Sequence, residues 1–311
     1  MSEHESKARI LLVDDAPEHL QLLRQLLRET SDVEFVGSGE EALAAAQTHP
    51  DLVLLDVAMP EMDGYEVCRR LKLDRTTQDI PVIFLTECDA ETQEARALKL
   101  GAVDYITKPI SSPVVHTRII NQIAISRNNA ELKRLATTDS LTGAFNRRHF
   151  LELAGKEFAR MRRYRHAVSC LMMDIDHFKR VNDSYGHDVG DQAIIATAQM
   201  AKQALRTEDV FGRIGGEEFA AMLPMTRLDK AEQVAERLRL AIAGMRLPLE
   251  SGETLAFTVS IGLVEVAPDR ESFEQAMKRA DQALYQAKHE GRNRVVTAPV
   301  VPGPTLVVAN G

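Results

Sequence analysis

Several side chains in the first third of the sequence can act together on a phosphoryl group. Asp14 and Asp15 directly follow one apolar run, and Asp56 directly follows another. Carboxylates that meet at the ends of neighbouring strands repel one another unless a cation neutralises them, so this clustering predicts an oxygen-rich pocket for Mg²⁺. Lys108 can reach phosphoryl oxygens as a point charge, and Thr86 can donate a hydrogen bond to the same group. Any one acid here could be an ordinary solvated side chain, but the ordered set predicts a phosphoryl acceptor.

A second acidic group follows an apolar segment in the second half of the chain. Asp174 and Asp176 come where this predicted strand ends, and GGEE at 215–218 predicts a hairpin turn between two strand-like runs. A strand-end carboxylate can hold a divalent ion while a phosphate approaches from solvent, and glycines let a ligand come close to the backbone. Alone, GGEE would be an ordinary polar hairpin. With Lys288 and Arg292 further along the chain, it indicates a nucleotidyl-transfer site.

The first half alternates short apolar runs with stretches of helical period. The runs that predict strands are Ile10–Val13, Val33–Val36, Leu52–Leu55, Val82–Leu85 and Val103–Ile106. The stretches that predict helices are Glu18–Arg28, Glu40–Gln47, Tyr65–Leu73 and Glu91–Leu100. Continuously apolar strands separated by helices predict an α/β doubly wound parallel sheet, whose ligands bind at the carboxyl ends of the strands.

The second half mixes helices with hairpins and predicts an α+β domain with a mostly antiparallel sheet. The predicted helices are Arg148–Arg163, Gln192–Leu205, Lys230–Ala243 and Phe273–Lys288, and the predicted strands are Val168–Met173, Phe219–Leu223 and Leu255–Val266. A helix from Pro113 to about Leu135 holds no clean heptad, so a dimeric stalk and a monomeric connecting helix both remain open. We expect a first domain over 1–125, a helical linker over 126–137, a second domain over 138–298 and a loosely ordered tail over 299–311.

Composition bounds the class of protein. The chain of 311 residues is 44% apolar and has a net charge of -8, typical of a globular protein of about two domains. Residues 1–125 carry 12 basic and 22 acidic side chains, a charge of -10, while the remainder carries +2. No apolar run approaches the roughly 20 residues that span a bilayer, and no helix-turn-helix pattern follows the first domain. We therefore expect a cytoplasmic protein that binds neither membrane nor nucleic acid.

The first half resembles the receiver domain of bacterial two-component response regulators over about residues 8–125. The motifs that carry the resemblance are LLVDD (11–15), LLDVAMPEMDG (54–64), FLT (84–86) and YITKP (105–109). The resemblance implies that a partner histidine kinase phosphorylates Asp56. It implies one Mg²⁺ held by Asp14, Asp15 and Asp56, and switch residues Thr86, Tyr105 and Lys108. Glu87 replaces the small residue usual after the switch threonine, which leaves the lifetime of the phosphorylated state open.

The second half resembles diguanylate cyclases of the GGDEF family over about residues 137–296. The motifs are DSLTGAFNRRHF (139–150), in which Ala144 replaces the usual leucine, and GGEEF (215–219). The resemblance implies a palm-type fold like that of nucleotidyl cyclases. It implies two Mg²⁺ ions, or Mn²⁺, bound by Asp174, Glu217 and the backbone carbonyl of Ile175. The catalytic carboxylates that it implies are Asp174, Glu217 and Glu218, with the exact role of Glu218 left open.

The same resemblance assigns the substrate and product contacts. It implies guanine recognition by Asn182 and Asp191, phosphate binding by Lys288 and Arg292, and product inhibition at the RxxD pattern of Arg206 and Asp209. An amide and a carboxylate together can satisfy the hydrogen-bonding edge of guanine, which adenine could not match. Two metal ions would activate the attacking 3′-hydroxyl and stabilise charge on the departing pyrophosphate.

We therefore expect a response regulator that condenses two GTP into cyclic di-GMP and two pyrophosphates. The product contains two guanylates and each domain has one GTP site, so the expected working unit is a homodimer, favoured by phosphorylation of Asp56. The alternative is a catalytically silent domain that senses GTP or cyclic di-GMP and acts through protein contacts.

Overall fold

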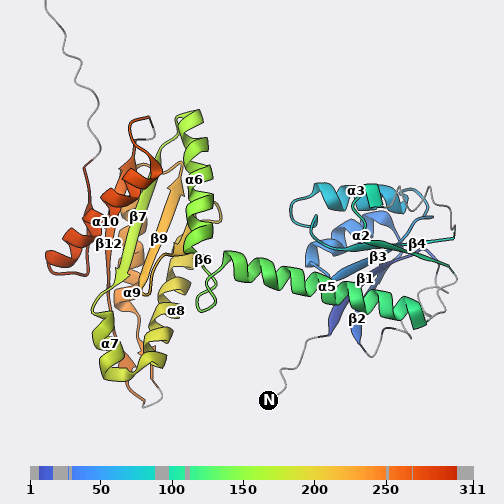
Figure 1. Ribbon diagram of the computed structural model, residues 1–311, viewed down its shortest axis with the longest axis horizontal. Helices are drawn as coiled ribbons and strands as arrows, with labels where there is room; N and C mark the ends of the chain where they lie inside the picture. The colour runs from blue at the N-terminus through green and yellow to red at the C-terminus, as the bar shows by residue number, and fades with distance from the viewer. Residues whose placement is uncertain are drawn as a thin grey trace, which may run out of the picture. The chain divides into compact units, whose positions relative to one another are not determined.

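The computed structural model describes residues 7–16, 27, 30–87, 98–108, 113–249, 252–267 and 269–299 (Figure 1). The chain divides into two compact units, Met1–Leu132 and Lys133–Gly311. The division falls within the helix α5, Pro113–Thr137, which confirms the helix predicted there. We describe each unit by itself.

The first unit contains a five-stranded parallel sheet. Its strands are β1 Ala8–Val13, β2 Ser31–Val36, β3 Leu52–Asp56, β4 Val82–Thr86 and β5 Asp104–Thr107. They lie in the order β2-β1-β3-β4-β5, and every neighbouring pair is parallel. All residues of β3 and β4 are buried, which explains why these strands are continuously apolar.

Helices cover both faces of this sheet. Residues of α2 (Gly39–Ala45), the short 3₁₀ turn η1 (Ala46–Thr48) and α3 (Gly64–Leu73) pack with one set of alternate strand residues, and α5 packs with the other set. The doubly wound α/β fold predicted from the sequence is therefore confirmed. The predicted helices over 18–28 and 91–100 lie almost entirely outside the described residues.

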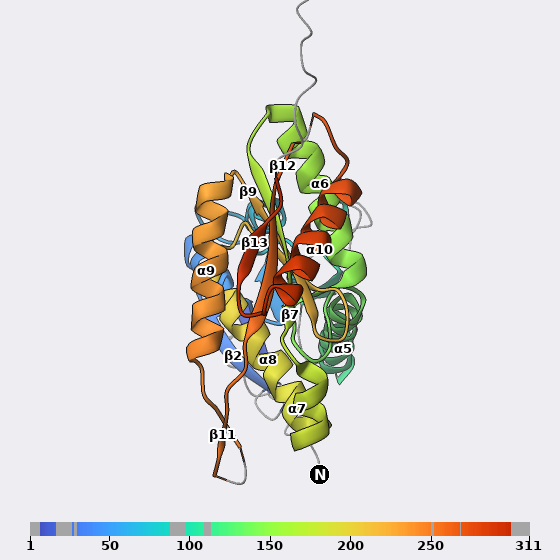
Figure 2. The same cartoon turned by 90° about the vertical axis from the view of Figure 1, so that its left-hand side faces the viewer.

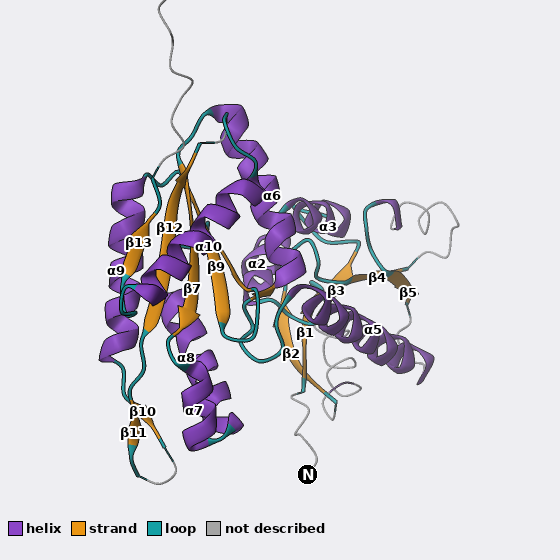
Figure 3. Cartoon of the chain, turned by 60° about the vertical axis from the view of Figure 1, so that its left-hand side comes forward, coloured by secondary structure: helices purple, strands orange, loops and turns teal. Residues whose placement is uncertain are grey.

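The second unit is built on a six-stranded mixed sheet in the order β13-β12-β7-β9-β8-β6. Its strands are β6 Phe145–Asn146, β7 Val168–Ile175, β8 Val210–Arg213, β9 Glu218–Pro224, β12 Val259–Val266 and β13 Val295–Thr297. The three inner pairings are antiparallel, while β6 and β13 pair in parallel at the two edges. A separate ribbon joins β10 (Leu247–Pro248) and β11 (Thr254–Leu255), as Figure 3 shows.

Two layers of helices enclose this sheet. The helices are α6 Arg147–Tyr164, α7 Phe178–Tyr185, α8 His187–Ala204, α9 Leu228–Gly244 and α10 Phe273–His289. α6 and α10 pack on the face that carries the even-numbered residues of β7, whereas α7, α8 and α9 pack on the opposite face. Figure 2 shows the sheet nearly edge-on between α9 and the pair α6 and α10. The predicted α+β sandwich with a mostly antiparallel sheet is confirmed.

One predicted strand is wrong in its extent. The run Leu255–Val266 divides into β11 and β12, because residues 256–258 leave the ladder. There, the carbonyl of Thr258 accepts a hydrogen bond from the backbone N–H of Asp176 at 2.9 Å, so this segment contacts the turn after β7. At the chain's end, the N–H of Ala298 donates to Leu263 at 2.9 Å; residues 300–311 lie outside the described part.

Candidate active site and phosphoacceptor site

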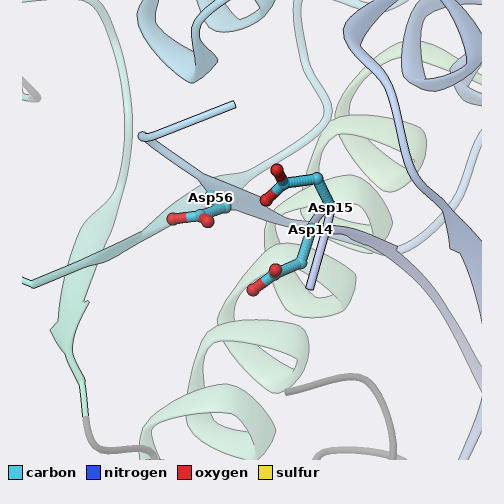
Figure 4. A group of neighbouring side chains, drawn as sticks. All are labelled: Asp14, Asp15 and Asp56. Atoms are coloured by element: carbon cyan, nitrogen blue, oxygen red, sulfur yellow. The ribbon is translucent and has the colours of Figure 1, made fainter. Parts of the chain in front are cut away.

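The acidic residues of the first unit meet where β1 and β3 end (Figure 4). Asp14 and Asp56 are buried, whereas Asp15 is exposed, and one carboxylate oxygen from each lies within 4.8 Å of the others. Among the described residues, this is the one group of three potential metal ligands that lies so close together. Carboxylate oxygens in this arrangement suit a hard divalent cation such as Mg²⁺.

Lys108, directly after β5, joins two of these carboxylates. Its ammonium lies 3.1 Å from Asp14 Oδ2 and 2.9 Å from Asp56 Oδ2. Burial raises the pKa of Asp56, the hydrogen bond from Lys108 opposes this rise, and the charge of Asp14 adds to it. Burial alone would lower the pKa of Lys108, but its bonds to Asp56 and Asp14 outweigh burial and raise it. The lysine is therefore the protein's own counter-cation for Asp14 and Asp56, the predicted phosphoacceptor.

The predicted switch residues lie on the two neighbouring strands. Thr86 is the buried last residue of β4, and its carbonyl accepts a hydrogen bond from the backbone N–H of Lys108 at 2.7 Å. Tyr105, on β5, is half-buried against the core beneath α2 and α3. Glu87 is exposed just after Thr86. Gly64 is required by close approach, because a Cβ there would overlap the backbone carbonyl of Asp56.

In the second unit, Asp174 lies near the end of β7 and pairs directly with Glu218 on β9. Both belong to the sheet face covered by α10, and the ammonium of Lys288, in the last turn of that helix, lies 2.8 Å from Asp174 Oδ2. Burial raises the pKa of Asp174 from 3.8 to about 6, opposed by Lys288 and increased by the charges of Glu217 and Glu218. The structure thus gathers the predicted catalytic carboxylates and one predicted phosphate-binding cation.

The GGEE turn joins β8 to β9 as a tight hairpin, as predicted. The N–H groups of Ile214 and Gly215 donate to the carbonyl of Glu218 at 2.8 and 3.3 Å. The guanidinium of Arg213 donates to the carbonyl of Gly216 at 2.7 and 3.1 Å and forms an ion pair with Asp139 at 3.0 Å. The turn is therefore fastened to the start of the DSLTGAF segment, a link that sequence reading missed.

The two residues predicted to recognise guanine lie on α7 and α8. Asn182 has a buried side-chain oxygen without a hydrogen-bond partner among the described residues. Gly190 of α8 leaves room for it, since a Cβ there would overlap that oxygen. Asp191 follows and is exposed. A buried unsatisfied acceptor is costly, so a hydrogen-bond donor that reached this oxygen would stabilise the site.

The RxxD residues line a small cavity of about 180 Å³ between α8 and β8, together with Lys202, Phe211 and part of the segment 143–145. The backbone N–H of Arg206 donates to Asp209 Oδ2 at 2.8 Å. Burial raises the pKa of Asp209, and this hydrogen bond opposes the rise. Arg292 lies elsewhere, in the turn that follows α10, four residues after Lys288.

Comparison with known proteins identifies both units. A family model described as "Diguanylate cyclase, GGDEF domain" matches residues 136–294. The chain belongs to this GGDEF diguanylate cyclase family. A second model, described as "Response regulator receiver domain", matches residues 10–120, so a receiver domain precedes the GGDEF domain. The resemblances seen in the sequence are confirmed.

Two relatives match most of the chain. The response regulator PleD of Caulobacter vibrioides is 33% identical over 296 residues, which cover 93% of this chain and 65% of PleD. Diguanylate cyclase A of Treponema denticola is 31% identical over 261 residues, 79% of this chain and 68% of that protein. The chain spans just under two thirds of the length of PleD and 46% of the probable diguanylate cyclase DgcC of Escherichia coli.

Solved GGDEF structures match the second unit. The coiled coil and GGDEF domain of DgcB from Caulobacter crescentus, in complex with c-di-GMP, matches with a TM-score of 0.55 at 33% identity, over 59% of this chain and 99% of that one. The diguanylate cyclase SiaD of Pseudomonas aeruginosa, in complex with its activator SiaC, matches with a TM-score of 0.52 at 38% identity, over 60% and 70%. In the described part of the chain, no helix has the length and apolarity to cross a membrane.

Proposed function

We propose that this protein is a response-regulator diguanylate cyclase that condenses two GTP into cyclic di-GMP and two pyrophosphates. The observation that supports this most directly is the cluster at one end of β7, where buried Asp174 forms an ion pair with Lys288 and lies close enough to Glu217 and Glu218 for their charges to raise its pKa. A GTP-consuming response regulator of this kind would act in the cytoplasm.

The donor set at this end of β7 fits divalent cations. Burial, with the charges of Glu217 and Glu218, raises the pKa of Asp174, and a carboxylate in such a place is stabilised most when a cation neutralises it. Asp174, Glu217 and the carbonyl of Ile175 would hold Mg²⁺, which supplies activation of the 3′-hydroxyl and stabilisation of charge at the α-phosphate. Lys288, whose only ion pair in the described structure is with Asp174, can turn to the triphosphate once Asp174 binds a cation.

Base selection follows from Asn182 and Asp191. Guanine offers two N–H donors on the edge where its carbonyl also lies, so an amide oxygen and a carboxylate are complementary acceptors. The unpartnered oxygen of Asn182 gains its missing hydrogen bond when such a donor binds. Adenine lacks this donor pair and would leave the site unsatisfied.

A dimer is proposed because one GTP site per domain must be brought face to face with another. Three apolar side chains on α5, Ile125, Leu132 and Leu135, are 51%, 63% and 54% exposed. Their spacing of seven and then three residues puts them on one side of the helix, as in a coiled-coil seam. Phosphorylation of Asp56 by a histidine kinase, with the phosphoryl group contacting Lys108, would favour this dimer.

The test is incubation of the purified chain with GTP and Mg²⁺, with and without acetyl phosphate, followed by chromatography of the nucleotides. We expect cyclic di-GMP, formed faster after phosphoryl transfer, and no product from Glu217→Ala. Asp56→Asn should retain the unstimulated rate and lose the response to acetyl phosphate. Binding of GTP without turnover in either state would refute the enzyme and favour the silent sensor.

Product inhibition is proposed at the cavity of Arg206 and Asp209. Arg206→Ala removes the guanidinium but keeps the backbone N–H that holds Asp209. We expect unchanged initial rates and a rise of about tenfold or more in the cyclic di-GMP concentration needed for half inhibition. An inhibition curve identical to that of the wild type would place the regulatory site elsewhere.

A further inference from the structure

The turn after α10 has an unusual backbone. Gly291, Arg292 and Asn293 have φ angles of +116°, +63° and +44°, so three consecutive residues occupy the region that favours glycine. Asparagine tolerates this region better than most residues, but arginine does not. Such a conformation persists only where the surroundings hold it, and it often marks a functional constraint.

The surroundings hold Asn293 from two sides. Its backbone N–H donates to Asp176 Oδ2 at 3.0 Å. On the other side, the guanidinium of Arg239, on α9, donates to the Asn293 carbonyl at 3.2 Å and to its side-chain oxygen at 2.7 Å. The N–H of Arg292 donates to the carbonyl of Ala287 in α10 at 3.0 Å. Both peptide groups that flank Arg292 are therefore fixed.

Asp176 uses its carboxylate to hold this turn rather than to bind a metal ion. The residue is only 4% exposed, and its two oxygens accept from Ser260 Oγ at 2.6 Å, from Thr258 Oγ1 at 2.6 Å and from Asn293. These three donors use most of the acceptor capacity of a carboxylate. Asp174, two residues earlier on β7, instead forms an ion pair with Lys288, whose ammonium sits on a long, flexible side chain. The two aspartates of the DID segment thus have different partners.

We infer that Asp176 is a positioning residue for Arg292: through the N–H of Asn293 it holds the left-handed turn that presents the Arg292 guanidinium to the triphosphate. This rests on the proposed function, because it assumes that Arg292 binds phosphate. The end of β7 and the turn that follows it then carry both a metal-binding carboxylate, Asp174, and the support for a phosphate-binding cation, Asp176. Arg239 is the second support, acting from α9.

The test uses the full chain with Mg²⁺ and α,β-methylene-GTP, an analogue that binds without reacting, and guanosine as a probe without phosphates. Arg292→Ala and Asp176→Ala should each lower the affinity for the analogue by about tenfold and leave the affinity for guanosine unchanged. In the double variant Asp176→Ala/Arg292→Ala, the affinity should be no lower than in Arg292→Ala alone, since coupled residues are not additive.

Two further variants separate positioning from folding. Asp176→Asn keeps an acceptor for Asn293 when its amide nitrogen donates to Ser260, so it should retain most of the affinity. Glu271→Ala is the matched control: this buried carboxylate, just before α10 at the end opposite Lys288, bonds to Arg279 and to the N–H of Ala267. It should lower the thermal midpoint without changing the affinity for the analogue.

If Asp176→Ala proves too unstable, Arg239→Ala tests the same turn through the same double-variant comparison. Effects of Asp176→Ala and Arg292→Ala that multiply, or an equal loss of guanosine affinity, would overturn the inference while leaving the cyclase reaction intact. Analogue binding with the expected coupling but no cyclic di-GMP would refute the proposed function and support the inference. Failure of the wild type to bind the analogue would refute both.

Discussion

Asp174 is buried beside other negative charges, and the stability of the folded domain therefore depends on whether Asp174 is protonated. Its pKa is raised from 3.8 to about 6 in the folded chain, so the folded state binds the proton more tightly than the unfolded state between these values. The stabilising contribution of protonation is complete below the unfolded pKa and is lost as the pH rises through about 6.

We therefore expect that the thermal midpoint of the metal-free protein, relative to Asp174→Asn, falls as the pH is raised from 4 to 7, the window set by these two values. Thermal denaturation of both proteins in a chelating buffer checks this. With saturating Mg²⁺ the variation of this relative midpoint with pH should shrink, because a bound cation takes the place of the proton. A difference between the two proteins that does not vary with pH would mean that the pKa of Asp174 is not raised.

Substitution of Asn182 should affect stability and GTP binding in opposite directions. Its buried oxygen has no hydrogen-bond partner in the part of the chain that the structure describes, so Asn182→Ala removes an unsatisfied acceptor. We expect an unchanged or higher thermal midpoint together with a loss of about tenfold or more in affinity for GTP, measured by calorimetry. Gly190→Ala, which pushes a methyl group toward the same oxygen, should also weaken GTP binding. Undiminished affinity in both variants would remove Asn182 from the base site.

At the scale of elements, α10 holds Lys288 in place because it packs directly on the backbone of β12. A Cβ at Gly262 would overlap the carbonyl of Ala280 and the N–H of Leu284 in that helix. Gly262→Ala must therefore move a helix, and overpacking of this kind costs about 1–3 kcal/mol, with the higher end expected where backbone atoms are struck.

The matched control is Gly155→Ala in α6, where nothing lies within 4 Å of the added methyl group. That change should stabilise the chain by about 0.5–1 kcal/mol, as alanine does in helices. Chemical denaturation of both variants measures the two effects. Equal stabilities for the two variants would contradict the close packing of α10 on β12.

The elements that sequence reading found are those whose burial leaves a local pattern. β3 and β4 are buried throughout and appear as unbroken apolar runs. β13 and β6, by contrast, have only three and two residues, and their pairing depends on neighbours far away in the chain. The same holds in the site: Asp174 and Asp176 look alike in DID, and only contacts to Asn293, distant in sequence, separate their roles.

For the whole molecule, the proposed dimer would form through the exposed apolar side of α5. Leu132→Glu puts a charge on that side, and burying it in a dimer would be unfavourable. We expect dimerisation after treatment with acetyl phosphate to weaken by about tenfold or more, with a parallel loss of stimulated cyclic di-GMP synthesis. Analytical ultracentrifugation measures the first effect and chromatography the second. Ala130→Glu, at an exposed position on the opposite side of the same helix, is the control and should dimerise normally.

The hydrogen bond between Asp176 and Asn293 joins residues 117 positions apart, so during synthesis the site of the second unit forms later than the site of the first. The acidic cluster and Lys108 of the receiver domain are present once residue 108 has been made, and the core beneath them is complete once α5 has been made. The carboxyl end of β7 is supported by this hydrogen bond only after the turn at 291–293 and β13 have been made. Because domains fold as units from the N-terminus during translation, the proposed phosphoacceptor site would form in a growing chain before the proposed cyclase site.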